Sequence, residues 1–191
     1  GANHLPLTLQ QPWRLFTATV LHAGIIHLAF NMWALRETGR IAERFYGNLQ
    51  FLAIYLTSAL FGSLASLFFA AERGVSVGAS GAVFGVVGCL LAALTAKSHK
   101  LPPGLAAPMR TAMLAFVGYS LFMGFVATFI DNAAHIGGLV AGFAMGLLMV
   151  EKYDREQFVR QAPIRAAVAI SMALVVAFLI WNLLLPAPRV A

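Results

Sequence analysis

The sequence predicts an all-α fold, a polytopic bundle of six transmembrane helices. The chain has 191 residues, of which 60% are hydrophobic and 10% charged, whereas a soluble domain carries about 25% charged residues. Asp, Glu, Lys and Arg are absent from six long stretches, namely 15–35, 45–71, 74–96, 111–130, 132–150 and 166–188. Each stretch can hold the helix of about 20 residues that crosses about 30 Å of hydrocarbon. A soluble core is the alternative, but these segments are too many, too long and too free of charge.

The basic residues predict how these helices lie in the membrane. Within the stretches we place the helices at 15–35, 50–71, 80–96, 111–130, 133–150 and 166–185. Alternate loops then carry 10 basic residues on one side and 3 on the other: Arg36, Arg40, Arg44, Lys97, Lys100, Arg110, Lys152, Arg155, Arg160 and Arg165 against Arg14, Arg73 and Arg189. By the positive-inside rule the larger group faces the cytoplasm, so both termini lie outside. The net charge of +6 therefore reflects topology, and we expect no nucleic-acid partner.

An N-terminus on the outer side implies a further expectation. Nothing before Trp13 resembles a signal peptide or a membrane helix, yet a chain that starts outside normally needs a preceding segment to bring it there. We therefore expect the native protein to have a transmembrane helix upstream of this sequence.

Polar side chains inside the predicted helices indicate where function lies, because polar groups at membrane depth are costly. The first helix carries His22, His27 and Asn31. Ser80 opens the third helix and His135 lies at the start of the fifth, so all of them fall in one outer layer. Singly, such a Ser bonds its own backbone and such a His bridges helices. Together they predict a serine–histidine catalytic site.

Glycines predict that the third and fifth helices pack closely. Small residues spaced four apart let helix backbones approach each other in lipid. Such glycines follow Ser80 on the third helix and His135 on the fifth, namely Gly81, Gly85 and Gly88, and Gly138, Gly142 and Gly146. General helix packing explains them equally well, but these faces begin beside the Ser and the His, so their contact would bring the two together.

These motifs resemble the rhomboid family of intramembrane proteases. The resemblance covers residues 12–150 and lies in Trp13-Arg14, His22-xxxx-His27-xxx-Asn31, Gly78-Ala-Ser80-Gly81 and Ala134-His135-xx-Gly138-xxx-Gly142. It implies a rhomboid-type bundle whose six helices match the family's second to sixth plus an added seventh. The expected parts are a core at 1–150 lacking the family's first helix, a cytoplasmic linker at 151–165, and a last helix with a short outer tail at 166–191.

The resemblance also implies roles for the site residues. Ser80 matches the nucleophile and His135 the general base, while His27, Asn31 and the Ser80 backbone N–H match the groups that hold the oxyanion. Phe84 matches an aromatic residue, often Tyr in the family, that stacks on the catalytic His. The supporting residues are expected to be Gly78, Gly81, Gly138, Gly142 and His22.

The resemblance implies a dyad without an acid. Asp131 lies four residues before His135, but we expect it in the outer loop and outside the catalytic group. His and carboxylate residues do not cluster at metal-ligand spacing, so no metal and no cofactor is expected. The family also implies a moving side gate at 111–130 and a cap at 124–134.

The function expected from the sequence is that of a serine endopeptidase that cleaves transmembrane protein substrates near the outer face. We expect a multi-pass protein of the bacterial plasma membrane, with the site facing outside and the lipid bilayer around it. A substrate helix must first loosen, which Gly or Pro near the interface would allow. The alternatives are a catalytically inactive rhomboid-like protein that binds membrane clients, and a transporter or channel. Against the transporter, we find no internal repeat and no acidic relay within the helices.

Overall fold

The computed structural model describes residues 1–69, 74–127, 130–149, 151–153 and 155–184. Within them the structure is helical, and the described residues outside helices form one isolated bridge between Asn3 and Ser76. The helices are α1 (Leu5–Gln10), α2 (Arg14–Thr17), α3 (Ile25–Tyr46), α4 (Asn48–Phe69), α5 (Ser80–Ala96), η2 (Ser98–Lys100), α6 (Ala106–Val126), α7 (Asn132–Leu148), α8 (Arg155–Arg160) and α9 (Ala162–Leu184). The all-α prediction is confirmed, and the six long helices correspond to the six predicted segments.

The first predicted helix was wrong in position. Helix α3 covers 25–46 rather than 15–35, and residues 14–17 form the separate short helix α2. The apolar stretch ends at Arg36, but the helix continues because its later turns are amphipathic. Arg40 faces solvent while Ala42 and Tyr46 are buried. Absence of charge therefore marks the apolar first part of this helix and not its end.

His22 is a second correction that follows from the first. It lies in the loop before α3 and not inside the helix. The other boundaries differ less. Helix α6 begins at Ala106, before the predicted 111, and so includes Arg110, whose Nη1 donates to the Leu94 carbonyl at 3.3 Å. The start of α5 at Ser80 and its end at Ala96 are as predicted. Arg73, Arg189 and the tail after 184 lie outside the described residues.

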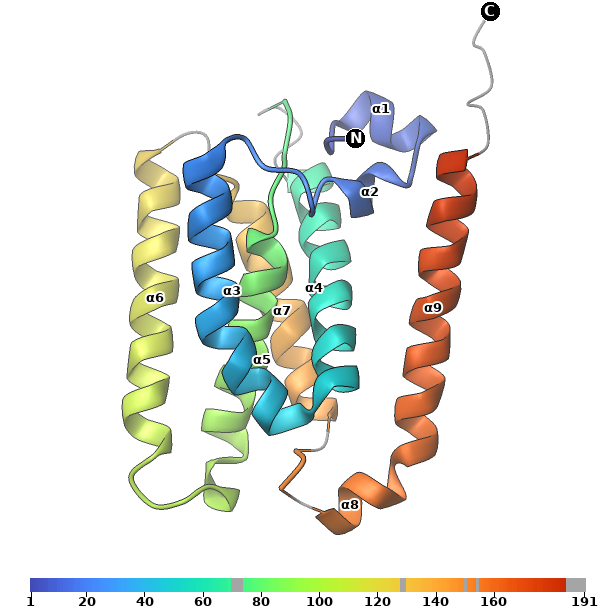
Figure 1. Cartoon of the computed structure of the whole chain (residues 1–191). Helices are drawn as coiled ribbons and strands as arrows, with labels where there is room; N and C mark the ends of the chain where they lie inside the picture. Colours follow the sequence, from blue (N-terminus) through green and yellow to red (C-terminus); the bar gives the residue numbers. More distant parts are fainter. Residues whose placement is uncertain (70–73, 128–129, 150, 154, 185–191) are drawn as a thin grey trace, which may run out of the picture.

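Helix α5 is the centre of the bundle (Figure 1). All residues from Gly81 to Leu94 are buried, and α5 packs against α3, α4, α6 and, most extensively, α7. In contrast, only Met113, Val117 and Gly124 are buried on α6. Helices α3, α5 and α7 all begin at the same end of the bundle (Figure 1). We call it the Ser80 end, and the opposite one the Lys97 end.

The segment before α3 lies over the Ser80 end (Figure 1). Asn3 bonds through its backbone to Ser76 at 3.0 and 2.9 Å, and its Nδ2 donates to the Ser63 carbonyl at 2.8 Å. Arg14 donates to the Ala2 carbonyl and to the Gln11 side chain at 3.2 and 2.7 Å. These contacts join the N-terminal segment to α4 and to the loop that leads into α5.

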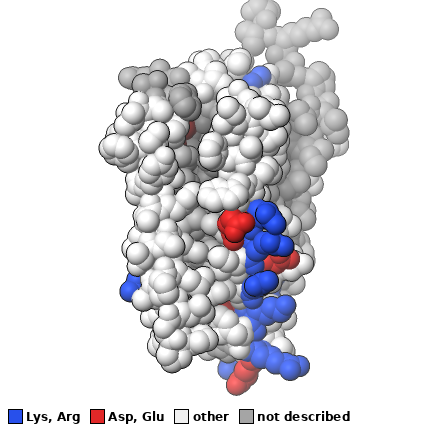
Figure 2. All heavy atoms as spheres, turned by 60° about the vertical axis from the view of Figure 1, so that its left-hand side comes forward, with Lys and Arg blue, Asp and Glu red and all other residues white. Residues whose placement is uncertain are grey.

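Length and composition separate the described helices further. Helices α4 and α6 are long and apolar enough to cross a membrane, with mean hydropathy of 1.8 and 1.4 over their best windows, while α5 and α7 are shorter apolar helices. Lys and Arg gather in the lower half of the face seen in Figure 2, toward the Lys97 end. The crossing of all six helices stays a prediction.

Candidate active site

Ser80 is the first residue of α5 and follows a tightly bent loop. Gly78 has a φ of +131°, a conformation that favours glycine, and its N–H donates to the Ala18 carbonyl at 2.9 Å. A Cβ at Gly78 would lie 2.9 Å from His27 Nε2 and 3.8 Å from Ser80 Oγ. Only glycine therefore fits between these two side chains, and the His27 ring borders the loop that carries Ser80.

Helices α5 and α7 touch through their backbones, as their glycine spacing predicted. A Cβ on any of three α7 glycines would overlap a carbonyl oxygen of α5, at 1.9, 1.8 and 2.6 Å. The facing pairs are Gly138 with Gly81, Gly142 with Gly85, and Gly146 with Cys89. The contact runs along both helices and begins beside Ser80 and His135.

His135, on α7, packs against the face of α5 that begins with Ser80. Its ring stacks on Phe84, with centroids 4.1 Å apart and planes 10° apart. Phe84 lies four residues after Ser80, one helical turn along the same face. The predicted contact of Phe84 with His135 is thus confirmed. His135 is 6% exposed, and its Nδ1 is buried without a hydrogen-bond partner among the described residues.

The loop before α3 orients His27. The Ala23 N–H donates to His27 Nδ1 at 3.4 Å, so in the neutral imidazole the proton belongs on Nε2. Nε2 and Cε1 of the ring both border Gly78 in the Ser80 loop. The His22 ring packs edge-on against His27, with centroids 5.2 Å apart. His22 therefore contacts His27 from the loop before α3.

Asn31 lies one turn below His27 on α3 and is 6% exposed. Its Nδ2 donates to the His27 carbonyl at 2.9 Å, and its Oδ1 is buried without a hydrogen-bond partner among the described residues. The structure brings Asn31 to the Ser80 end, but its recorded hydrogen bond is to its own helix. The second N–H of the amide remains as a donor for a ligand, and Oδ1 remains as an acceptor.

Asp131 has two other partners. It is the N-cap of α7, where Oδ1 accepts from the Ala134 N–H at 3.0 Å, and Oδ2 accepts from Ser66 Oγ. Such a cap satisfies one of the free N–H groups at a helix start. The carboxylate thus joins α7 to α4 at the Ser80 end, whereas His135 Nδ1 has no hydrogen-bond partner within the part of the chain that the structure describes.

Asn132 is a residue whose importance the sequence reasoning missed. It is buried, and its Nδ2 donates to the Leu121 carbonyl near the end of α6 at 3.0 Å. A Cβ at Gly124 would overlap Asn132 Oδ1 at 2.0 Å, so the glycine makes room for the amide. The signal was present as a polar residue at the start of an apolar helix, three positions before His135.

Comparison with known proteins gives a consistent family. Residues 9–152 match the family described as the Rhomboid domain. The chain is 43% identical over 153 residues to rhomboid protease GluP of Bacillus subtilis (strain 168), an alignment that covers 77% of this chain and 29% of GluP. It is 39% identical over 150 residues to RHOMBOID-like protein 6, mitochondrial, of Arabidopsis thaliana, covering 78% and 48%.

A third relative comes from another kingdom. Rhomboid-like protease 1 of Toxoplasma gondii is 36% identical over 161 residues, which covers 82% of this chain and 52% of that protein. This chain therefore spans about half or less of the length of these three relatives. The matched part contains α3 to α7 with Ser80, His135, His27 and Asn31.

Proposed function

This chain belongs to the rhomboid family, a family of integral membrane proteins, and we propose that it is a serine endopeptidase that cuts transmembrane proteins. Ser80 is the nucleophile and His135 the general base. The observation that carries the proposal is the stack of His135 on Phe84, one turn beyond Ser80. Names of relatives such as rhomboid protease GluP support protease chemistry at the level of the family.

The proposed reaction has two steps. His135 Nε2 takes the Ser80 hydroxyl proton while Oγ attacks the scissile carbonyl carbon, and the imidazolium then gives that proton to the leaving amine. Water attacks the resulting acyl-enzyme, loses its proton to His135 and releases the acid, which restores Ser80. No metal or cofactor is needed for either step.

The aromatic stack supports a dyad without an acid. When His135 accepts a proton, positive charge forms on a ring that lies flat against Phe84 at 4.1 Å. The face of an aromatic ring attracts a cation by about 0.5–2 kcal/mol. Asp131 is engaged as the cap of α7, so Phe84 takes over part of the stabilisation that an acid would supply.

The oxyanion is held, in this proposal, by His27, Asn31 and the Ser80 backbone N–H. The Ser80 N–H is free of helical bonding because it lies at the start of α5. The hydrogen bond from Ala23 to His27 Nδ1 supports a proton on Nε2, which borders Gly78 in the Ser80 loop. Each donor of this kind contributes about 3 kcal/mol to the transition state.

The bundle supports cleavage near the outer membrane face. The site lies at one end of α3, α5 and α7, and basic residues gather toward the other end (Figure 2), which the positive-inside rule assigns to the cytoplasm. Substrates are transmembrane segments whose helix opens at that depth. A bacterial plasma membrane with the site facing outside fits this arrangement.

Covalent labelling tests the proposal. A fluorophosphonate probe reacts with an activated serine, and we expect it to label the wild-type protein in proteoliposomes but not Ser80→Ala or His135→Ala. Ser120→Ala, on the exposed helix α6, is the matched control and should label fully. A folded wild type that takes no label would instead favour an inactive protein that binds membrane clients.

A further inference from the structure

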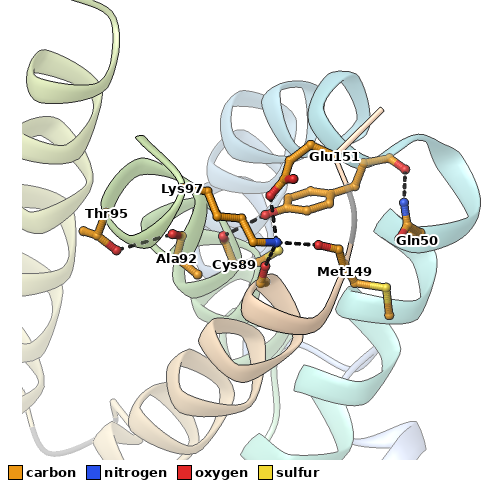
Figure 3. Close-up of polar contacts among 9 residues, drawn as sticks. Gln50, Cys89, Ala92, Thr95, Lys97, Met149 and Glu151 are labelled. Carbon is orange, nitrogen blue, oxygen red and sulfur yellow. Dashed lines mark hydrogen bonds and ion pairs between the residues drawn. The ribbon is translucent and has the colours of Figure 1, made fainter. Parts of the chain in front are cut away.

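The Lys97 end of α5 and α7 holds a cluster of polar contacts that the proposed chemistry does not use (Figure 3). Lys97 caps α5, and its ammonium reaches across to α7. Nζ donates to the carbonyls of Gly146 at 3.0 Å and Met149 at 2.6 Å, and lies 2.9 Å from Glu151 Oε1. An ammonium has three donors, so all three are directed at the end of α7.

Glu151 makes these contacts costly to lose. Its side chain is 1% exposed, and that of Lys97 is 17% exposed. Both carboxylate oxygens are buried, with Lys97 as the recorded charge partner. Removing one member of a buried pair leaves the other charge without compensation, which is strongly destabilising. The Lys97–Glu151 pair therefore fixes where α7 ends relative to α5.

The remainder of the α5–α7 contact fixes that position only in part. Its glycines recur every four residues, so a slide of α7 by one turn toward the Lys97 end places Gly138 against Gly85 and Gly142 against Cys89. At the third contact the slide places Ala134 against Gly81, where a Cβ comes 1.9 Å from the carbonyl oxygen and the helices must part locally. One turn displaces α7 by about 6 Å, far enough to separate Ser80 from His135. The glycines thus oppose the slide at the contact next to Ser80 and permit it at the two contacts nearer Lys97.

We propose that Lys97 and Glu151 are positioning residues that set the register of α7 against α5 and so keep His135 beside Ser80. A one-turn slide would move the Gly146 and Met149 carbonyls away from Nζ and leave Glu151 buried without a charge partner. Register selection is the best-attested use of buried polar groups in helix pairs. The consequence for catalysis rests on the proposed function, whereas the register itself does not.

Disulfide-length cross-linking reads the register directly. Native Cys89 belongs to the buried cluster against which Met145 packs. Met145→Cys should therefore link to Cys89 in the observed register. Ala141→Cys lies one turn earlier on α7 and should link to Cys89 only after the slide. A short bis-methanethiosulfonate reagent, which forms a disulfide with each of two thiols and releases sulfinate, is applied to each in proteoliposomes, with and without changes at Lys97 and Glu151.

The decisive background is the double variant Lys97→Met/Glu151→Met, which removes both charges and leaves no unpaired ion. We expect its thermal stability to stay near that of the wild type, while links from Cys89 form to position 141 as well as 145. Lys97→Met alone should lower the melting temperature. Lys97→Arg, which keeps the donors, and Lys152→Met, an exposed lysine, should both keep the wild-type pattern.

Two outcomes decide the matter. If the double variant links Cys89 only to position 145, as the wild type does, the pair serves stability alone and the proposal is overturned. If the slide occurs, the rate of fluorophosphonate labelling at Ser80 should fall about tenfold or more, since displacement of reacting groups by a few ångström is costly. If the cross-links follow our expectation while Ser80 of the wild type takes no fluorophosphonate label, that result would support the register proposal and contradict only the proposed function.

Discussion

The two ends of the α5–α7 pair differ in the charge that faces their buried polar groups. At the Ser80 end, His135 Nδ1 and Asn31 Oδ1 are buried without hydrogen-bond partners among the described residues. At the Lys97 end, both Glu151 carboxylate oxygens are buried as well, but one ammonium lies 2.9 Å from Oε1 and donates to two carbonyls at 3.0 and 2.6 Å. A buried unpaired polar group costs about 1–3 kcal/mol. The Ser80 end therefore carries a cost in stability that the packing below must offset.

The largest effect should come from breaking that packing. Gly142→Val would place a Cβ 1.8 Å from the Gly85 carbonyl oxygen. The clash is with backbone, so no side chain can turn aside to relieve it. We expect a loss of more than about 4 kcal/mol of stability, seen as failure to accumulate folded protein in the membrane. Gly118→Ala is the matched control, since a Cβ there meets nothing within 4 Å. If both variants fold equally well, the close α5–α7 contact is wrong.

The next effect concerns the donors at the Ser80 end. His27→Ala removes the proposed oxyanion donor that borders Gly78. We expect kcat for a reporter substrate to fall by about 10²–10³-fold with little change in melting temperature, because the ring lies beside a loop at the helix start. His27→Gln, which retains an N–H donor, should recover part of the rate. An unchanged kcat in His27→Ala would remove this residue from the site.

A smaller effect is expected for the stack on His135. Phe84→Leu keeps an apolar side chain but loses the parallel rings at 4.1 Å, an interaction of about 0.5–1.5 kcal/mol. The rate of cleavage should fall roughly 2–10-fold, and Phe84→Tyr should preserve it. A fall of the same size in both variants would contradict the stack as the source of the effect, because Tyr keeps the ring.

The smallest effect should come from Asp131→Asn. Asn caps a helix about as well as Asp, so the bond to the Ala134 N–H should persist and the melting temperature should change little. We expect cleavage to stay within about threefold of the wild type, an effect under 1 kcal/mol. Loss of cleavage in a folded Asp131→Asn protein would reveal an acid that the dyad lacks.

The sequence predicted more of the α5–α7 pair than of α3. For α5, the uncharged stretch 74–96 and the helix end at the same residue, because residues Gly81 to Leu94 are all buried and nothing charged fits. For α3, half of the later turns face solvent, so charges begin at Arg36 while the helix continues to Tyr46. The hydropathy of a segment reflects whether its side chains face apolar or aqueous surroundings. The later turns of α3 face both, so only their amphipathic pattern shows that the helix continues to Tyr46.

The surroundings of the candidate site were predictable where a local pattern records them. The close approach of α5 and α7 beside Ser80 and His135 was predicted from glycine spacing, and the Phe84 contact from family resemblance. The catalytic roles of Ser80 and His135 stay a prediction. The Lys97–Glu151 pair and the bond from Asn132 to the Leu121 carbonyl were not found. Each joins residues of different helices through a side chain whose direction depends on register, which no local pattern records.

Cleavage of a reporter transmembrane peptide by wild type and by Ser80→Ala tests the central claim most directly. Both proteins are purified alike, checked for equal melting temperatures and reconstituted into the same lipid. The account predicts that the wild type cuts the peptide and that Ser80→Ala is slower by at least about 10³-fold. Equal cleavage by the two proteins would contradict it.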